Sequence, residues 1–303
     1  MIKEMNPFDA LREFFARSPE LVAAYLYGRY AEPPTYPDSD IEVGLLFRKG
    51  ISEEEVQRFV ERLGEESPIG PGSGILLPTP LNEHILPVQY EQVRFGTVLS
   101  DNDPAERVRF EAEVHARLLS ERPKLLEEAR EALQQARALG EGIPTFSPRP
   151  GRTLRLVDPI RAGWRIARIL SSCAVIEVAT REIDKTAQDP DRVAQLVGWF
   201  SNAAGAATGI AKAMLSTYEH PRPPRRWQVF LPLGDLGILP MEQALWMAAM
   251  VETRWTLLTA DGFAHPERVC AILRAYLPYL LHFARVSAWA TEMPEVGEAS
   301  RVH

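Results

Sequence analysis

The sequence predicts an α+β fold, with an N-terminal domain of strands and helices over residues 1–141 and an all-α bundle over residues 158–303. Three observations support this prediction. Short runs with strand composition occur only in the first part. The stretch GIPTFSPRPG, residues 142–151, has three prolines and two glycines and predicts a linker over residues 142–157. Beyond it, four long segments carry apolar residues at helical spacing, which is typical of a bundle.

The N-terminal elements follow from local signals in chain order. A first helix precedes a strand that stops at Gly28, and a second strand ends at Phe47 after a loop rich in proline. Ser52 is a good N-cap for the next helix, and the acidic residues after it suit the helix dipole. Pro123 is expected to break or kink the long last helix. The expected elements are helices over residues 7–17, 52–63 and 104–139, strands over residues 23–27, 41–47 and 75–77, and a strand or turn over residues 85–88.

The C-terminal part is predicted to form four long helices, over residues 159–183, 191–217, 241–258 and 266–289. Residues 193–211 carry no charge over 19 positions, which is close to bilayer-spanning length, but they include polar side chains and three glycines. We therefore expect a buried helix rather than a membrane span. Gly205, Gly209 and Ala213 form a small-residue face that lets another helix approach closely.

Composition indicates the environment of the protein. The net charge of −7 gives no general attraction to nucleic acid or membrane, and 46% apolar residues is ordinary for a globular protein. Cys173 and Cys270 match neither a disulfide framework nor a zinc spacing, so we expect buried thiols in a reducing compartment. The N-terminus lacks an apolar signal core. These features predict a cytoplasmic protein with no membrane partner.

The stretch LYGRYAEPPTYPDSDIEVGLLF, residues 26–47, contains two carboxylates that alternate along a strand. Side chains two apart on a strand share a face, so Asp40 and Glu42 are expected to point the same way. Such a pair can share a magnesium ion, which prefers oxygen ligands and aligns the phosphates in phosphoryl transfer. Gly28 leaves room for the backbone to approach a triphosphate. A D-x-E pair by itself is more often a solvated strand face.

The order of these residues resembles that of minimal nucleotidyltransferases (MNT) of the DNA polymerase β superfamily. That family has a Gly-Ser pair, a loop and Asp-x-Asp; here Gly28-Arg29 is followed by ten residues and Asp40-x-Glu42. The downstream stretch LNEHILPVQYEQVRFGTVLSDNDPAERVRFEAEV is also similar, and the resemblance spans residues 8–139. It implies a polymerase-β-like domain in which Asp40 and Glu42 are catalytic and hold Mg²⁺. It also implies that Gly28 and Arg29 bind the phosphates of a nucleoside triphosphate.

Three positions depart from the family pattern. Arg29 replaces serine, and its side chain either binds a phosphate, fills the pocket or pairs with Asp40. Glu42 replaces aspartate. The third carboxylate of the family is expected at Leu77, within GILLPTPLN, which has no acidic residue. Loss of a base or metal ligand normally costs several orders of magnitude in rate. Catalysis is therefore expected to be impaired unless another carboxylate, such as Glu83, replaces the missing one.

The stretch DGFAHPERVCAILRAYLPYLLHFARV, residues 261–286, resembles the last helix of HEPN domains, which are often fused to minimal nucleotidyltransferases. The resemblance spans residues 158–292. HEPN toxins cleave RNA with an arginine and a histidine at sites formed where two domains pair. Arg254 occupies the arginine position, but Thr259 falls at the histidine position and cannot act as a base near neutral pH. A HEPN ribonuclease is therefore not expected.

Three functions remain open. The first is an MNT–HEPN fusion of toxin–antitoxin type with both sites degenerate, which acts by binding a nucleotide, RNA or a protein partner. The second is an active magnesium-dependent nucleotidyltransferase with a protein or RNA acceptor, and the third is a HEPN ribonuclease. The small-residue face predicts a homodimer through the helical domain. The resemblance to HEPN domains, which act in pairs, implies the same.

Overall fold

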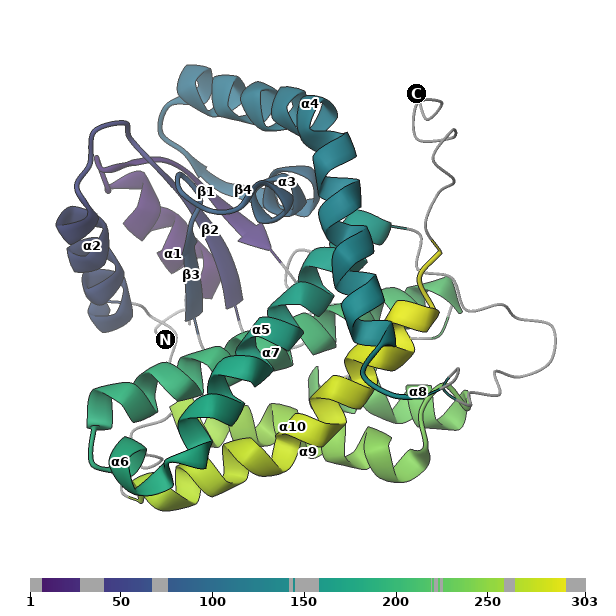
Figure 1. The fold of residues 1–303 in the computed structure, drawn as a ribbon. Helices are drawn as coiled ribbons and strands as arrows, with labels where there is room; N and C mark the ends of the chain where they lie inside the picture. Colours follow the sequence, from purple (N-terminus) through teal and green to yellow (C-terminus); the bar gives the residue numbers. More distant parts are fainter. Residues whose placement is uncertain are drawn as a thin grey trace, which may run out of the picture. The chain divides into compact units, whose positions relative to one another are not determined.

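The computed structural model describes residues 7–27, 41–66, 76–141, 144, 158–218, 220, 223, 226–258 and 265–292. A four-stranded sheet in the N-terminal part is followed by a long series of helices (Figure 1). This arrangement confirms the predicted α+β class. The contacts divide the chain into two compact units, Met1–Arg122 and Pro123–His303.

The division between the units falls inside helix α4, Pro104–Arg137. Residues of its second half, including Leu133 and Ala136, belong to the hydrophobic core of the helical unit. Helix α4 continues through Pro123, although proline cannot donate the backbone hydrogen bond of that turn. The predicted linker, residues 142–157, lies outside the described residues except for Pro144.

The sheet of the first unit is mixed, with the strand order β3-β2-β1-β4. Strand β1 pairs antiparallel with both β2 and β4, whereas β2 and β3 are parallel. The strands are β1 (Leu21–Tyr27), β2 (Ile41–Phe47), β3 (Leu76–Pro80) and β4 (Thr97–Asp101), and the helices of this unit besides α4 are α1 (Pro7–Ala16), α2 (Glu53–Glu66) and α3 (Leu86–Phe95).

Each face of the sheet packs against its own layer of helices, because successive strand side chains point to opposite faces. Ile41, Val43 and Leu45 of β2 pack with buried residues of α1 and α2. On the other face, Tyr25 and Leu46 belong to a separate cluster that includes Phe110 of α4. The second face also carries Glu42, which is two residues from Gly44 and on the opposite side from Ile41.

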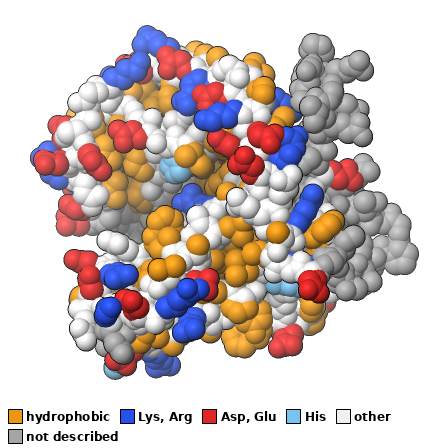
Figure 2. All heavy atoms as spheres, viewed as in Figure 1, with side chains coloured by type: hydrophobic (Ala, Val, Ile, Leu, Met, Phe, Trp, Pro, Cys, Tyr) orange, Lys and Arg blue, Asp and Glu red, His pale blue; other side chains and the backbone are white. Residues whose placement is uncertain are grey.

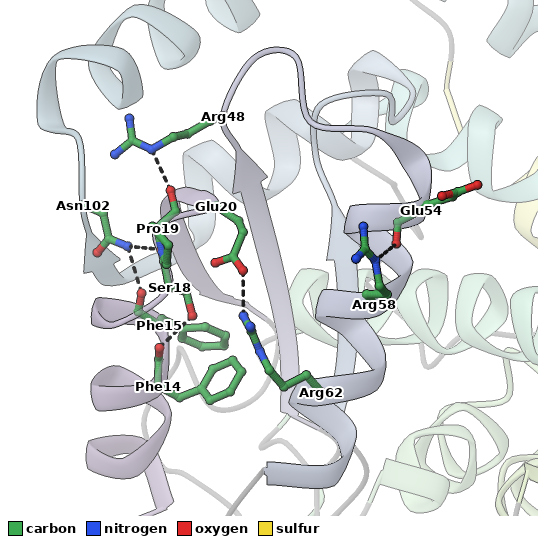
Figure 3. A network of polar contacts seen from close by, with 10 residues as sticks. All are labelled: Phe14, Phe15, Ser18, Pro19, Glu20, Arg48, Glu54, Arg58, Arg62 and Asn102. Atoms are coloured by element: carbon green, nitrogen blue, oxygen red, sulfur yellow. Dashed lines mark hydrogen bonds and ion pairs between the residues drawn. The ribbon is translucent and has the colours of Figure 1, made fainter.

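Polar contacts close the end of the sheet that lies near Leu21 and Phe47 (Figure 3). The side chain of Asn102 donates to the carbonyls of Phe15 at 2.8 Å and Ser18 at 3.1 Å, and Arg48 Nε donates to the Pro19 carbonyl at 2.8 Å. These bonds satisfy the backbone where helix α1 turns into β1. Tyr27 and Glu42 form the last pair of β1 with β2 at the opposite end of the sheet.

Two local predictions are corrected by the structure. Residues 85–88, expected as a strand or turn, begin helix α3, with Ile85 as N-cap and proline in the first turn, a position where its missing N–H costs nothing. Strand β4 was not anticipated, because its five residues are too few to show a period. Ser52 caps α2 as expected: its Oγ accepts from Glu55 N–H at 3.3 Å, while the Glu55 carboxylate accepts from Ser52 N–H at 2.9 Å.

The second unit is a bundle of long helices, as the spacing of apolar residues predicts. Asp158 and Asp189 cap α5 and α7, each accepting a 3.1 Å bond from a backbone N–H of the first turn. Buried residues of α5, α7, α9 and α10 form one core. The elements are α5 (Pro159–Arg181), α6 (Ile183–Ala187), α7 (Pro190–Thr217), the 3₁₀ helix η2 (Arg226–Phe230), α8 (Leu231–Asp235), α9 (Met241–Leu258) and α10 (Pro266–Trp289).

The apolar helices of this unit are packed within the bundle. Helix α7, expected from its uncharged stretch to be buried, has thirteen buried residues. Among the described helices, α10 alone is long and apolar enough to cross a bilayer, and half of the relevant window is buried in the fold. Cys173 and Cys270 are both free and buried, as predicted, and burial raises the pKa of Cys173 to about 12.

Charges of both signs are interspersed on the face of the molecule that Figure 2 shows. Figure 2 shows acidic and basic side chains mixed with exposed hydrophobic ones on the face in view. This distribution agrees with the modest net charge of −7. A charged ligand is therefore expected to be recognised by a local site rather than by a general field.

Candidate functional site

Tyr27, Glu42 and Leu77 are neighbours on three adjacent strands. They lie at the end of the sheet opposite the polar contacts of Asn102 and Arg48. Glu42 of β2 is the direct partner of Tyr27 in the antiparallel pair with β1. Glu42 is also the partner of Leu77 in the parallel pair with β3. Partners in register point to the same face, and all three residues are partly exposed. Glu42 is therefore placed where a ligand can reach it.

The structure describes only some of the residues that the sequence singled out. Glu42 lies on β2 between Tyr27 and Leu77, and Arg254 lies on α9, partly exposed. Gly28, Arg29, Asp40 and Thr259 lie outside the described residues. The geometry of the site is therefore built from Glu42 and its described neighbours.

The predicted place of the missing third carboxylate is directly beside Glu42. The register of β3 with β2 puts Leu77 there, so an apolar side chain occupies the position. Glu83 is too distant to replace it. Its neighbour Asn82 bonds with Phe47 N and O, both at 2.8 Å. Phe47 is five residues from Glu42, or roughly 16 Å along the strand.

Helix α3 brings polar side chains onto the same face of the sheet. Gln92 lies over Gly44, where a Cβ atom would come within 1.9 Å of its Oε1. Gln89 Nε2 donates to the carbonyl of Leu81 at 2.7 Å. Gln89, Glu91 and Gln92 are all buried. The sequence predicts a strand or turn over residues 85–88, so this group was not expected. The available signal was the run QYEQ, which places three polar residues after an apolar helix start.

The carboxylate of Glu42 is a ligand of the kind that a hard cation prefers. Gln92 Oε1 is buried and accepts no hydrogen bond from the described residues, and it lies on the face that carries Glu42. Magnesium usually takes one or two protein carboxylates, with waters and substrate phosphates completing its shell. Glu42 would supply one such carboxylate, whereas Gln92 lies over Gly44, two residues further along β2. In the described chain no three His, Cys, Asp or Glu side chains gather into a metal-binding group.

A partly buried hydrogen-bond network holds α4 against this face of the sheet. Tyr25 Oη donates to Glu111 at 3.0 Å, and Arg107 pairs with Glu111 at 2.7 Å and with Asp101 at 3.0 Å. Burial raises the pKa of Tyr25 strongly, and the charge of Glu111 adds to the effect. The hydrogen bond to Glu111 raises the pKa of Arg107. Tyr25 is therefore a neutral donor that positions α4 beside the site.

Three described features of the helical unit bear on ribonuclease chemistry, which the sequence does not lead us to expect. Next to Arg254, Thr253 Oγ1 shares a 2.9 Å hydrogen bond with Tyr276 Oη. His265 lies at the start of α10 as its N-cap residue and makes no side-chain cap bond. His282 has its pKa lowered by burial and by Arg285. None of these observations supplies the base that Thr259 fails to provide.

Comparison with known proteins adds one weak structural similarity. No protein family and no curated protein matches the sequence. One solved chain, from a crystal structure of a mutant of the toxin–antitoxin pair MntA-HpeT, aligns with 40% of this chain and 96% of its own length. The identity is 14% and the TM-score is 0.29. A similarity of this size decides neither family nor activity.

Proposed function

We propose that this protein is a nucleotidyltransferase-like protein of toxin–antitoxin type that binds a nucleoside triphosphate with a divalent cation at the Glu42 end of the sheet. Its catalysis is impaired. The observation that supports this function best is the position of Leu77, an apolar residue directly beside Glu42. The toxin–antitoxin setting rests on the resemblance of the sequence to MNT and HEPN proteins.

The proposal follows from what each group supplies. Glu42, together with Asp40 from the sequence motif, holds the cation, which neutralises the triphosphate and aligns it. Gly28 and Arg29 contact the phosphates. A carboxylate at the Leu77 position would activate the attacking hydroxyl or complete the metal shell, and leucine does neither. Binding therefore persists while transfer is slowed by several orders of magnitude.

The alternative is an active magnesium-dependent nucleotidyltransferase with a protein or RNA acceptor. One observation favours it: Glu91 on α3 is a carboxylate with only 3% exposure, next in sequence to Gln92, which contacts the face of Glu42. If Glu91 acts for the missing carboxylate, Glu91→Gln lowers turnover strongly while Glu83→Gln does not.

The test is calorimetric titration of ATP, GTP, CTP and UTP with and without Mg²⁺. We expect binding that needs the cation and is lost in Asp40→Ala and in Glu42→Gln. Glu83→Gln is the matched control, because this exposed carboxylate lies at the far end of β2. The absence of binding for all four nucleotides in the wild-type protein would refute the proposal. Turnover of a bound nucleotide at an ordinary enzymatic rate would favour the alternative.

The helical unit is proposed to mediate homodimerisation and to contact RNA without cleaving it, in a cytoplasmic setting. Arg254 and Thr259 are remnants of the HEPN site in this proposal. Light scattering at high protein concentration tests the dimer, and a monomer there would rule it out. RNA cleavage that disappears in Arg254→Ala would show instead that the ribonuclease site is active.

A further inference from the structure

Helices α5 and α7 pack against each other, and two arginines of α5 face Gly209 and Asn202 of α7. A Cβ atom built on Gly209 would lie 2.8 Å from Cζ of Arg165, so this guanidinium covers Gly209. One turn along α5, Arg168 Nη2 donates a 2.8 Å hydrogen bond to Oδ1 of Asn202. Gly209 and Asn202 are two turns apart on α7, so the two arginines contact α7 at different levels.

Gly205 lies between these levels on the same side of α7, since residues three and four apart are neighbours on a helix. A Cβ atom built on Gly205 would meet no atom of the described residues within 4 Å, although the residue is only partly exposed. The surface of α7 therefore has a notch at Gly205, with Arg165 towards one end and Arg168 towards the other. Helix α5 therefore approaches this small-residue face, as the sequence predicts, and it places two arginines along the face.

No carboxylate balances Arg168 in the described part of the chain. Its hydrogen-bond partner, Asn202, is a neutral amide. Burial lowers the pKa of Arg168, and no acidic neighbour opposes this effect. Keeping a partly buried cation without an anion costs free energy. A bound anion would offset this cost.

Two more polar atoms near these residues are unused. Ser201 Oγ, next to Asn202 in the chain, and Trp164 Nε1, one turn before Arg168, are buried without a hydrogen bond among the described residues. The Trp164 ring also lies 5.4 Å from Cζ of Arg165. A hydroxyl and an indole N–H can both donate, so the unused atoms have the polarity that suits an anion.

We propose that the notch at Gly205 binds a phosphate group, with Arg165 and Arg168 as its donors. Guanidinium groups bind phosphate through pairs of N–H donors, and glycine lets the ligand approach the helix backbone. The phosphate belongs either to a nucleic-acid backbone or to a free nucleotide, which share this chemistry. The site lies on helices of the second unit and does not depend on Glu42.

The experiment measures binding of two probes to the full-length protein at low salt without a divalent cation. The probes are fluorescein-labelled single-stranded RNA and a fluorescent ATP analogue. Arg168→Met removes the charge at similar size, and Gly205→Leu fills the notch. Arg181→Met is the matched control, because Arg181 is on the same helix but is exposed and paired with Glu177 at 2.7 Å. We expect about a tenfold or larger loss of affinity in the first two variants and no change in the control.

The outcomes separate the sources of the phosphate. A loss for RNA alone assigns the notch to a nucleic-acid backbone, and a loss for the ATP analogue assigns it to a nucleotide. Arg168→Lys keeps the charge and is expected to retain part of the affinity, while circular dichroism checks that each variant is folded. Wild-type protein that binds neither probe, or folded variants that bind as tightly as wild type, would overturn the proposal. The titration contains no divalent cation, so the site at Glu42, which is proposed to need the cation, does not contribute to the measured binding.

Discussion

Leu77 lies directly beside Glu42 in the parallel pairing of β3 with β2. This relationship places an apolar side chain where the resemblance to nucleotidyltransferases implies a carboxylate. A substitution at Leu77 therefore tests whether a carboxylate at this position is the one group that the proposed nucleotide site lacks.

A carboxylate introduced at this position should restore transfer. We expect Leu77→Asp to raise the rate of nucleotide turnover at least roughly tenfold, because it supplies a base or metal ligand next to Glu42. The measurement is release of pyrophosphate from ATP with Mg²⁺. Leu76→Asp is the control: Leu76 packs with the opposite core, so this change should destabilise the fold without any gain in rate. An unchanged rate in a folded Leu77→Asp protein would count against the assigned role of this position.

Removing the Tyr25 hydroxyl should make the first unit less sensitive to alkali. Tyr25 is neutral in the folded protein, where burial and Glu111 raise its pKa, but in the unfolded chain it ionises near its ordinary pKa of about 10. Its contribution to stability is fully present below the unfolded pKa and is lost as the pH rises above it, by up to about 1.4 kcal/mol for each pH unit.

The comparison is urea unfolding of wild type and Tyr25→Phe at pH 9 and pH 11. At pH 9 the variant should be less stable by about 1 kcal/mol, because the hydrogen bond to Glu111 is lost. At pH 11 the gap should shrink or reverse. Equal slopes with pH in the two proteins would show that Tyr25 does not titrate differently on unfolding.

Gly163 on α5 is required for close packing with the second half of α4. A Cβ atom there would lie 2.5 Å from Cα of Ala129, a backbone atom that cannot move aside easily. We expect Gly163→Ala to destabilise the helical unit by about 2 kcal/mol or more. Gly198→Ala is the matched change, since a Cβ atom at Gly198 meets nothing within 4 Å, and it should stabilise α7 by about 0.5–1 kcal/mol. Thermal unfolding of the two variants measures the difference, and similar effects would refute it.

The aliphatic part of the Arg62 side chain should stabilise the folded protein more than its charge does. Arg62 pairs with Glu20 at 3.0 Å and lies 5.7 Å from the ring centre of Phe14 (Figure 3). It also lies 5.3 Å from the ring centre of Phe59. The ion pair is partly exposed, so a double-mutant cycle of Glu20→Gln and Arg62→Met should give a coupling below about 1 kcal/mol. Arg62→Ala should cost more than Arg62→Met, because methionine keeps apolar cover on the rings. Equal stabilities of the two Arg62 variants would contradict this view.

Local signals in the sequence were sufficient to predict most of the helices and strands. Ser52 marks a helix start through capping hydrogen bonds made within three residues. The prolines at the starts of α5 and α10 mark helix starts because the first turn does not use their missing N–H. The alternation in Ile41–Phe47 marks a strand with two packed faces. The resemblance also singled out Leu77 by its distance along the chain to Leu81 and Asn82, and the structure shows that this residue pairs with Glu42.

Tertiary packing decided the rest, because it depends on contacts between residues far apart in the chain. The assignment of the second half of α4 to the helical core, the position of Gln92 over Gly44 and the exclusion of Glu83 all follow from how elements meet. The clearest case is Gly205 and Gly209: their spacing indicates only that something approaches α7 closely. The structure shows that the guanidinium of Arg165 covers Gly209 and that the space at Gly205 stays open.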